Sequence, residues 1–375
     1  MKRFYCSIVL LLLVVFGGSI ARASAADVIT VPCDQDFVLS QAITTDENDL
    51  VLVGWTGTPM QPVPTMLAVS TDGVMRWEIK KNNVSRLFYD VISLGDHQVL
   101  ALRSSGEGRS ASVGEIVSNG QTIGEISNLA NVYRILGTAD GFILFCKDDF
   151  ESCRLEKRSM SGELLWKTEL PEPIMILDII VQDGNYIAIG RKQDDREGFP
   201  KSVMFQVDDA GNILCRYDSD SDEEYIKAVP ADDGSLVLIG NAFESRRYIS
   251  VDSIYAYSFI AKFNKENQIW RTDFRYESDN RPRDGYADAI VQVDNGYLVA
   301  ARGSRKRSEV MMQHYDADGR LLQSWFESTG SLYNPLKIML FPQNGKAILV
   351  ANGYARADDL QNYVSILKPI LLGDE

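Results

Sequence analysis

Short apolar runs recur along the chain, and a turn signal precedes each of them. In residues 286–303, YADAIVQVDNGYLVAARG, an apolar run that contains one acid, Asp288, leads into the turn Asp294-Asn295-Gly296 and then into a second apolar run. The second run is continuously apolar, as expected for a strand that is buried on both faces. The turn between the two runs predicts a β-hairpin.

This hairpin pattern occurs seven times. The second runs are LVLVGW (Leu50–Trp55), QVLALR (Gln98–Arg103), FILFCK (Phe142–Lys147), YIAIGR (Tyr186–Arg191), LVLIGN (Leu236–Asn241), YLVAAR (Tyr297–Arg302) and AILVAN (Ala347–Asn352). In six copies a turn glycine precedes the run, and these glycines are 43 to 62 residues apart: Gly95, Gly141, Gly184, Gly234, Gly296 and Gly345. Self-similarity at such spacings indicates a repeat architecture.

Each copy continues with a third strand, another turn and a fourth strand, as in DGVMRWEIK (Asp72–Lys80) and SGELLWKTEL (Ser161–Leu170). Four short strands repeated at this spacing predict an all-β fold, a seven-bladed β-propeller of four-stranded blades that occupies residues 26–375 as one domain. The last copy lacks a clear fourth strand. We expect Asp27–Val31 to supply that strand and to close the ring, which removes exposed sheet edges.

The turn followed by Trp, in Asp72–Trp77 and Ser161–Trp166, resembles the repeats of bacterial secreted β-propellers with PQQ-like and WD40-like repeats. The resemblance spans most of residues 26–375 and implies a fold rather than a chemistry. Family enzymes that use the quinone need a calcium site and particular acids, and some have a vicinal Cys pair, which this sequence lacks. The sialidase-type Asp box also fails to match, because Asp72 and Gly73 are adjacent. We therefore expect no cofactor.

Residues 1–25 have the features of a secretory signal peptide. Lys2 and Arg3 precede the apolar run Ile8–Gly18, and Ala23-Ser24-Ala25 is a cleavage signal. The apolar run is short for a membrane-spanning helix, which needs about 20 residues. We expect cleavage and a secreted or periplasmic protein with no membrane anchor; the alternative is an uncleaved anchor.

The chain is acidic, with a formal net charge of −14, and residues 1–25 contribute only positive charges to that total. Such a protein is repelled by phosphate backbones, so we expect no nucleic-acid partner. Cys146 and Cys153 flank the segment CKDDFESC, which predicts a local disulfide in an exported protein. Two free buried thiols are the alternative, and no C-x-x-C motif is present.

A polar residue precedes each hairpin turn on the first strand of its copy. These seven residues are Gln41, Asp90, Arg134, Asp178, Lys227, Asp288 and Lys337, and after Gln41 their charges alternate in sign. Because the first strand of a propeller blade lines the central channel, we expect a ring near one channel mouth. Two interpretations remain open: ion pairs and hydrogen bonds that lock neighbouring blades, or a polar pocket for a zwitterionic or polyhydroxy ligand.

The longest predicted loops share one face and lie in copies four to six, at residues 192–202, 218–225, 243–258, 276–286 and 303–309. They contain Tyr and Arg, which are favoured at binding hot spots. The candidate partner-binding residues are Arg246, Arg247, Tyr248, Tyr255, Tyr257, Tyr276, Arg281, Tyr286, Arg305 and Arg307. The alternative is that these loops are simply solvated. The acidic segment DSDSDEE lacks the glycine and terminal Glu of a calcium loop, so no metal site is predicted.

The sequence predicts no catalytic residues. Its two histidines, His97 and His314, lie in different copies, which disfavours a histidine-based zinc site or a Ser-His-Asp triad. We expect a monomeric, non-catalytic binding module that recognises a protein or glycan through the long-loop face. The alternative is a carbohydrate-active or quinone-type enzyme with its site at the central channel mouth.

Overall fold

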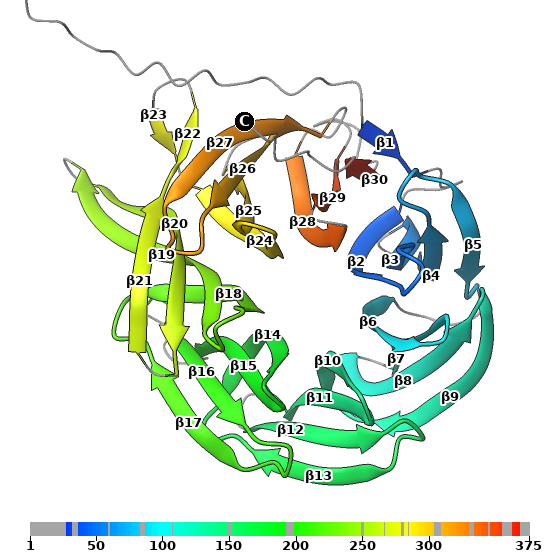
Figure 1. The fold of residues 1–375 in the computed structure, drawn as a ribbon. Coiled ribbons are helices and arrows are strands. Elements are labelled where there is room, and N and C mark those ends of the chain that lie inside the picture. Colours follow the sequence, from blue (N-terminus) through cyan, green and yellow to red (C-terminus); the bar gives the residue numbers. More distant parts are fainter. Residues whose placement is uncertain are drawn as a thin grey trace, which may run out of the picture.

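The computed structural model describes residues 28–31, 37–58, 61–82, 87–106, 108–148, 152–192, 199–248, 251–265, 267–278, 281–283, 285–303, 309–329, 334–343, 346–354 and 362–367. These residues form thirty β-strands, which are grouped in sheets around a central axis (Figure 1). They contain no helix that could cross a membrane. The chain is a β-propeller.

Six sheets each consist of four strands that follow one another in the chain and pair antiparallel in that order. They are β2–β5 (Phe37–Thr44, Leu50–Thr58, Gln61–Val69, Met75–Lys80), β6–β9 (Phe88–Gly95, Gln98–Gly106, Gly108–Ser118, Gln121–Leu129), β10–β13 (Val132–Thr138, Gly141–Asp148, Ser152–Ser159, Leu164–Glu169), β14–β17 (Ile174–Gln182, Asn185–Lys192, Ser202–Val207, Ile213–Asp218), β18–β21 (Glu223–Pro230, Leu236–Tyr248, Val251–Asn264, Asn267–Phe274) and β24–β27 (Gly285–Val293, Gly296–Gly303, Glu309–Tyr315, Leu321–Ser328). A separate hairpin consists of β22 (Tyr276–Ser278) and β23 (Arg281–Arg283).

The prediction of a seven-bladed propeller of four-stranded blades is wrong in its number of complete blades. Only six blades are complete units of four consecutive strands, because the last copy provides three: β28 (Asn334–Gln343), β29 (Lys346–Tyr354) and β30 (Asn362–Leu367). The sheet of these three strands takes its outermost strand, β1 (Val28–Thr30), from the other end of the chain, in the order β1-β30-β29-β28. The expectation that Asp27–Val31 closes the ring is thus confirmed by the pairing of Val28–Thr30 with β30 (Figure 1).

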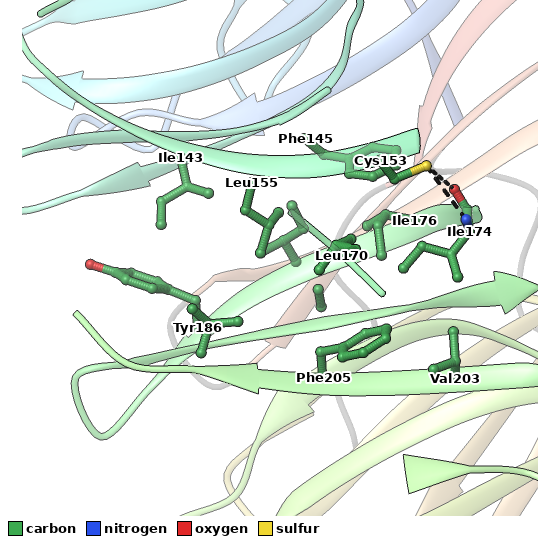
Figure 2. Packing of buried hydrophobic residues seen from close by; sticks show 13 residues of the cluster. Ile143, Phe145, Cys153, Leu155, Leu170, Ile174, Ile176, Tyr186, Val203 and Phe205 are labelled. Atoms are coloured by element: carbon green, nitrogen blue, oxygen red, sulfur yellow. Dashed lines mark hydrogen bonds between the residues drawn. The ribbon is translucent and has the colours of Figure 1, made fainter. Parts of the chain in front are cut away.

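The second strand of each sheet supplies much of the core, since its two faces pack against different neighbouring sheets. In β11, Phe142 and Leu144 lie in a cluster shared with β6 and β7, whereas Ile143 and Phe145 lie in a cluster shared with β14–β16. Figure 2 shows the second cluster, where residues such as Phe205 fill the space between the two sheets. This two-sided burial explains the continuous apolar runs in the sequence.

Cys146 and Cys153 do not form the predicted disulfide. Both are free and buried, and they lie on opposite faces of one sheet, Cys146 in the cluster toward β6 and Cys153 in the cluster toward β14. The Cys153 thiol instead contacts the backbone, where it donates to the carbonyl oxygen of Ile174 over 3.1 Å (Figure 2). Burial raises the pKa of the Cys146 thiol to about 12, which keeps it protonated.

A repeated contact joins the outer edges of neighbouring sheets. The side chain on an outer strand covers a turn glycine of the next sheet in the pairs Ile29–Gly73, Trp77–Gly120, Ile126–Gly162, Trp166–Gly211 and Trp270–Gly319. All five glycines have positive φ, and a Cβ on any of them would come within 3 Å of the covering side chain. The Trp and the turn glycine that recur in the sequence therefore form an inter-blade contact, in which the closing strand β1 takes part through Ile29.

Gly211→Ala is expected to lower the free energy of unfolding by about 2–3 kcal/mol. Alanine at the φ of +87° costs roughly 1–2 kcal/mol, and its Cβ would lie 2.9 Å from the Trp166 indole, so the contact must open. Gly184→Ala is the control, because Gly184 has φ +74° but no atom within 4 Å of the added Cβ. Urea denaturation of both variants measures the difference, and equal losses would contradict the inter-blade contact.

Candidate functional site

All seven polar residues predicted on the first strands lie together. Gln41, Asp90, Arg134, Asp178, Lys227, Asp288 and Lys337 line one central cavity of about 500 Å³, hereafter the large cavity. Each comes from the innermost strand of a different sheet, and we call the set the channel ring. The alternating charges of the sequence thus become neighbours around a common space.

A β-bulge accompanies the channel ring in every sheet. In six sheets the ladder skips one residue directly before the ring residue, as at Leu177 before Asp178. In β24 the skipped residue is Asp288 itself, because Ala287 and Ala289 pair with consecutive partners. Bulges re-aim side chains, and this one offsets Asp288 by one position from the other six.

The channel ring also borders a second cavity. A second cavity of about 300 Å³, the small cavity, shares Arg134, Leu177 and Lys337 with the large one. Residues that precede the ring on the inner strands, such as Leu39, line the small cavity, and residues that follow it, such as Ile43, line the large one. The whole ring therefore lines the large cavity, and two of its members, Arg134 and Lys337, also line the small one.

Two acids of the ring hydrogen-bond to the next sheet. A carboxylate oxygen of Asp90 accepts from the backbone N–H of Ile135 at 3.0 Å, and one of Asp178 accepts from that of Ala228 at 3.1 Å. Burial raises the pKa of both carboxyls, and the opposing effect of nearby cations, Arg134 for Asp90 and Lys227 for Asp178, is smaller. These bonds have the geometry of inter-blade locks.

Asp288 and Lys337 are also engaged by neighbouring groups. The Asp288 carboxylate lies 3.0 Å from Nε of Arg302, and burial raises the pKa of Asp288 to about 7. The Lys337 ammonium donates to the backbone carbonyl of Ser40, across the junction of the first and last sheets. Burial, and secondarily the positive charge of Arg134, lowers the pKa of Lys337 to about 7.

Arg134 and Lys227 differ from the other charged members of the ring. Among the residues with a described position, neither side chain has a hydrogen-bond acceptor, and the nearest acid to Arg134 is Asp90, whose Oδ2 lies 4.0 Å from Nη1. Both cations lower the pKa of Lys337, so all three positive groups interact across the channel. Both cations thus act on the ring acids through charge, while their N–H groups donate no hydrogen bond within the described residues.

The candidate partner-binding residues that the structure describes lie in strands, so their prediction as loop residues is wrong. Arg246, Arg247 and Tyr248 lie in β19, Tyr255 and Tyr257 in β20, Tyr276 in β22, Arg281 in β23 and Tyr286 in β24. Arg305 and Arg307 lie outside the described residues. The strand character has a signal in the sequence: residues 243–258 contain β-branched and aromatic residues and neither Gly nor Pro.

The β19–β20 hairpin extends beyond its blade. β18 pairs with β19 only up to Ala242, and β21 pairs with β20 only from Ser258 onward, but β19 and β20 remain paired up to Tyr248 and Val251. Residues 243–248 and 251–256 therefore form a two-stranded ribbon, which we call the β19–β20 ribbon. At its base the rings of Phe199 and Phe243 stack with centroids 5.9 Å apart.

No pattern in the sequence indicates the small cavity. Its walls include Leu87, Tyr133, Phe145, Met175 and Leu177. Tyr133 and Leu177 directly precede ring residues, and Phe145 lies in a second strand. Their spacing in the sequence does not distinguish these residues from core residues. Within the described part of the chain, no group of three or more His, Cys, Asp or Glu side chains could hold a metal ion.

Comparisons with known proteins identify the fold alone. No protein-family model matches the chain, and no curated protein matches it. Among solved structures, it is similar to the β-propeller domain of the Trilobed protease from Pyrococcus furiosus, with 11% identity, coverage of 90% of this chain and 96% of that one, and a TM-score of 0.54. The polysaccharide lyase Uly1 has 10% identity, coverage of 88% and 89%, and a TM-score of 0.55. A chain of the mitotic checkpoint complex has 9% identity, coverage of 98% and 99%, and a TM-score of 0.58.

Proposed function

We propose that this propeller is an exported, monomeric, non-catalytic binding module that recognises a protein or a glycan through the β19–β20 ribbon and the surface beside it. The observation that carries this proposal is the extension of the β19–β20 ladder beyond the four-stranded sheet, through the pair Tyr248 and Val251. Beyond the four-stranded sheet, β19 and β20 pair only with each other within the described residues. Loops and extensions on a rigid scaffold are where binding usually resides.

The ribbon offers two kinds of contact. Over residues 244–248 and 251–255, no further strand pairs with either edge in the described residues, so backbone donors and acceptors are available for strand addition by an extended peptide. Its sequence also provides Arg246, Arg247, Tyr248 and Tyr255, residue types that contribute strongly to binding energy. Residues 1–25, which resemble a signal peptide, support export. The inter-blade contacts of Trp with a turn glycine support a relationship to secreted PQQ-like propellers.

The engagement of the ring acids supports a non-catalytic role. Asp90 and Asp178 each direct a carboxylate oxygen to the backbone of the next sheet, and Asp288 faces Arg302. Glycoside cleavage by a carboxylate pair needs two acids that face one substrate. Here each acid contacts its own neighbour instead.

Shortening the ribbon is expected to abolish partner capture without unfolding the blade. Residues 244–255 are replaced with Asn-Gly, a two-residue hairpin turn that joins Phe243 to its partner Ala256. The removed segment contains Arg246 and Arg247 but also Glu244 and Asp252, so its removal leaves the net charge unchanged. The double variant Arg76→Gln/Arg320→Gln controls for the loss of two arginines, because it removes two at exposed positions near tight turns.

Each protein is used as bait for the envelope and medium of the source organism and is applied to a glycan array. We expect the wild type and the control to retain the same ligand and the shortened variant to lose it by about tenfold or more in affinity. Equal recovery by all three proteins would overturn the proposal.

A further inference from the structure

Every charged residue that lines the small cavity is positive. Its charged lining residues are Arg134, Lys147 and Lys337, and no acid lines it. This contrasts with the net acidity of the whole chain. A concave space bounded by one sign of charge concentrates counter-ions of the opposite sign.

Asp90 is the acid nearest to Arg134, with Oδ2 4.0 Å from Nη1. Asp90 lines only the large cavity, and both of its carboxylate oxygens accept backbone hydrogen bonds, from Val91 at 3.1 Å and from Ile135 at 3.0 Å. Arg134 lies at the boundary of the two cavities and, within the described residues, donates no hydrogen bond. Its guanidinium therefore remains available to a carboxylate or sulfate, which it can bind through two parallel hydrogen bonds.

The rest of the small cavity is apolar and aromatic. Leu87, Phe145, Met175 and Leu177 line it together with Tyr133, whose ring centroid lies 6.3 Å from that of Phe145. A space of about 300 Å³ is at the lower end of the range of small-molecule sites. An apolar wall beside a cationic end matches a molecule with a short hydrocarbon body and one anionic head.

The geometry points to a binding site for a small organic anion, an alkyl or aryl carboxylate or sulfonate, in the small cavity. Its head lies against Arg134 and Lys337, and its body lies against Tyr133, Phe145 and Met175. This site is separate from the β19–β20 ribbon and goes beyond the function proposed above, because neither depends on the other.

Calorimetric titration with sodium octanoate tests this assignment, with 1-octanol as the uncharged probe of equal chain length. We expect octanoate to bind the wild type with one-to-one stoichiometry and more tightly than octanol. Arg134→Gln is expected to weaken octanoate binding about tenfold or more, and Arg134→Lys to restore part of it. Lys227→Gln is the matched control, since Lys227 lines only the large cavity, and it is expected to bind octanoate like the wild type.

A second variant tests the apolar wall without a change in charge. Met175 lines the cavity and its side chain is partly exposed, so the larger side chain of Met175→Trp can be accommodated and fills part of the cavity. This variant is expected to weaken the binding of octanoate and of octanol alike. Thermal melting of each variant establishes that the fold persists. The assignment is overturned if octanoate shows no saturable binding in the millimolar range, if Arg134→Gln and Lys227→Gln lose equal affinity, or if octanol binds as tightly as octanoate.

Discussion

A chain that begins at residue 32 is expected to be less stable than one that begins at residue 26, by about 3–5 kcal/mol. The shorter chain lacks β1, whose three residues pair with β30 and provide the outermost strand of the closing sheet. It also loses two apolar contacts: Val31 is buried, and Ile29 packs against the same core cluster. Burial of each such side chain contributes about 1.5–3 kcal/mol, which sets the size of the expected loss.

Loss of β1 also affects the first blade, because Ile29 covers Gly73 at the outer edge. Urea denaturation of both chains measures the effect. A synthetic peptide of residues 26–31, added to the shorter chain, is expected to recover part of the stability, and a scrambled peptide to recover none. Superimposable unfolding curves for the two chains would refute closure by the N-terminal strand.

Asp288→Asn is expected to raise the free energy of unfolding above pH 7, by roughly 4 kcal/mol, and to change it little below pH 4. The folded carboxyl keeps its proton up to a pKa of about 7, whereas the unfolded chain loses it near the ordinary pKa of 3.8. Each pH unit between these values therefore lowers the wild-type free energy of unfolding by about 1.4 kcal/mol. Asparagine has no proton to lose and avoids this cost.

The charged groups around Asp288 set the limits of this effect. Arg302 faces the carboxylate directly, and Lys337 acts on it from the neighbouring inner strand, so both partly offset the cost of burial. Urea denaturation from pH 4 to pH 9 gives the pH profile of each protein. Asp208→Asn is a useful control, because turn hydrogen bonds lower the pKa of Asp208 and the sign of its effect is opposite. Parallel profiles for the wild type and Asp288→Asn would show that the carboxyl is not buried at a cost.

Local patterns predicted much of the fold. The apolar second strands and their turn glycines are encoded within each repeat, so periodicity alone revealed them. Ring closure was predictable for a related reason: the last copy lacked a fourth strand, and Asp27–Val31 was an apolar segment without a partner. The prediction of seven four-stranded blades was wrong, because a count of second strands does not give the number of complete blades, and only six copies provide four strands of their own.

The failures concern register and side-chain direction. The Cys146–Cys153 disulfide seemed favoured by proximity in the sequence, but Cys146 pairs with Arg154 and the two thiols point to opposite faces. A β-bulge cannot be read from one sequence, so the offset of Asp288 was not foreseen. The β19–β20 ribbon was interpreted as a loop because its residues are polar, although their strand propensity was high.

The candidate site, too, was only partly predictable from the sequence. The seven ring residues were predictable, because each is a polar residue at a similar place on the first strand of its copy and propeller geometry brings such positions together. The small cavity was not predictable, because nothing in the sequence distinguishes Tyr133 or Met175 from core residues. They line a cavity only because five different sheets meet around it.

Hydrogen–deuterium exchange of the intact chain, alone and in complex with its captured partner, tests the central claim most directly. If the propeller binds through the β19–β20 ribbon, exchange slows in residues 244–255 and is unchanged in the tight turns, such as that at Gly211. Slowed exchange confined to the tight turns, with residues 244–255 unaffected, would contradict the account.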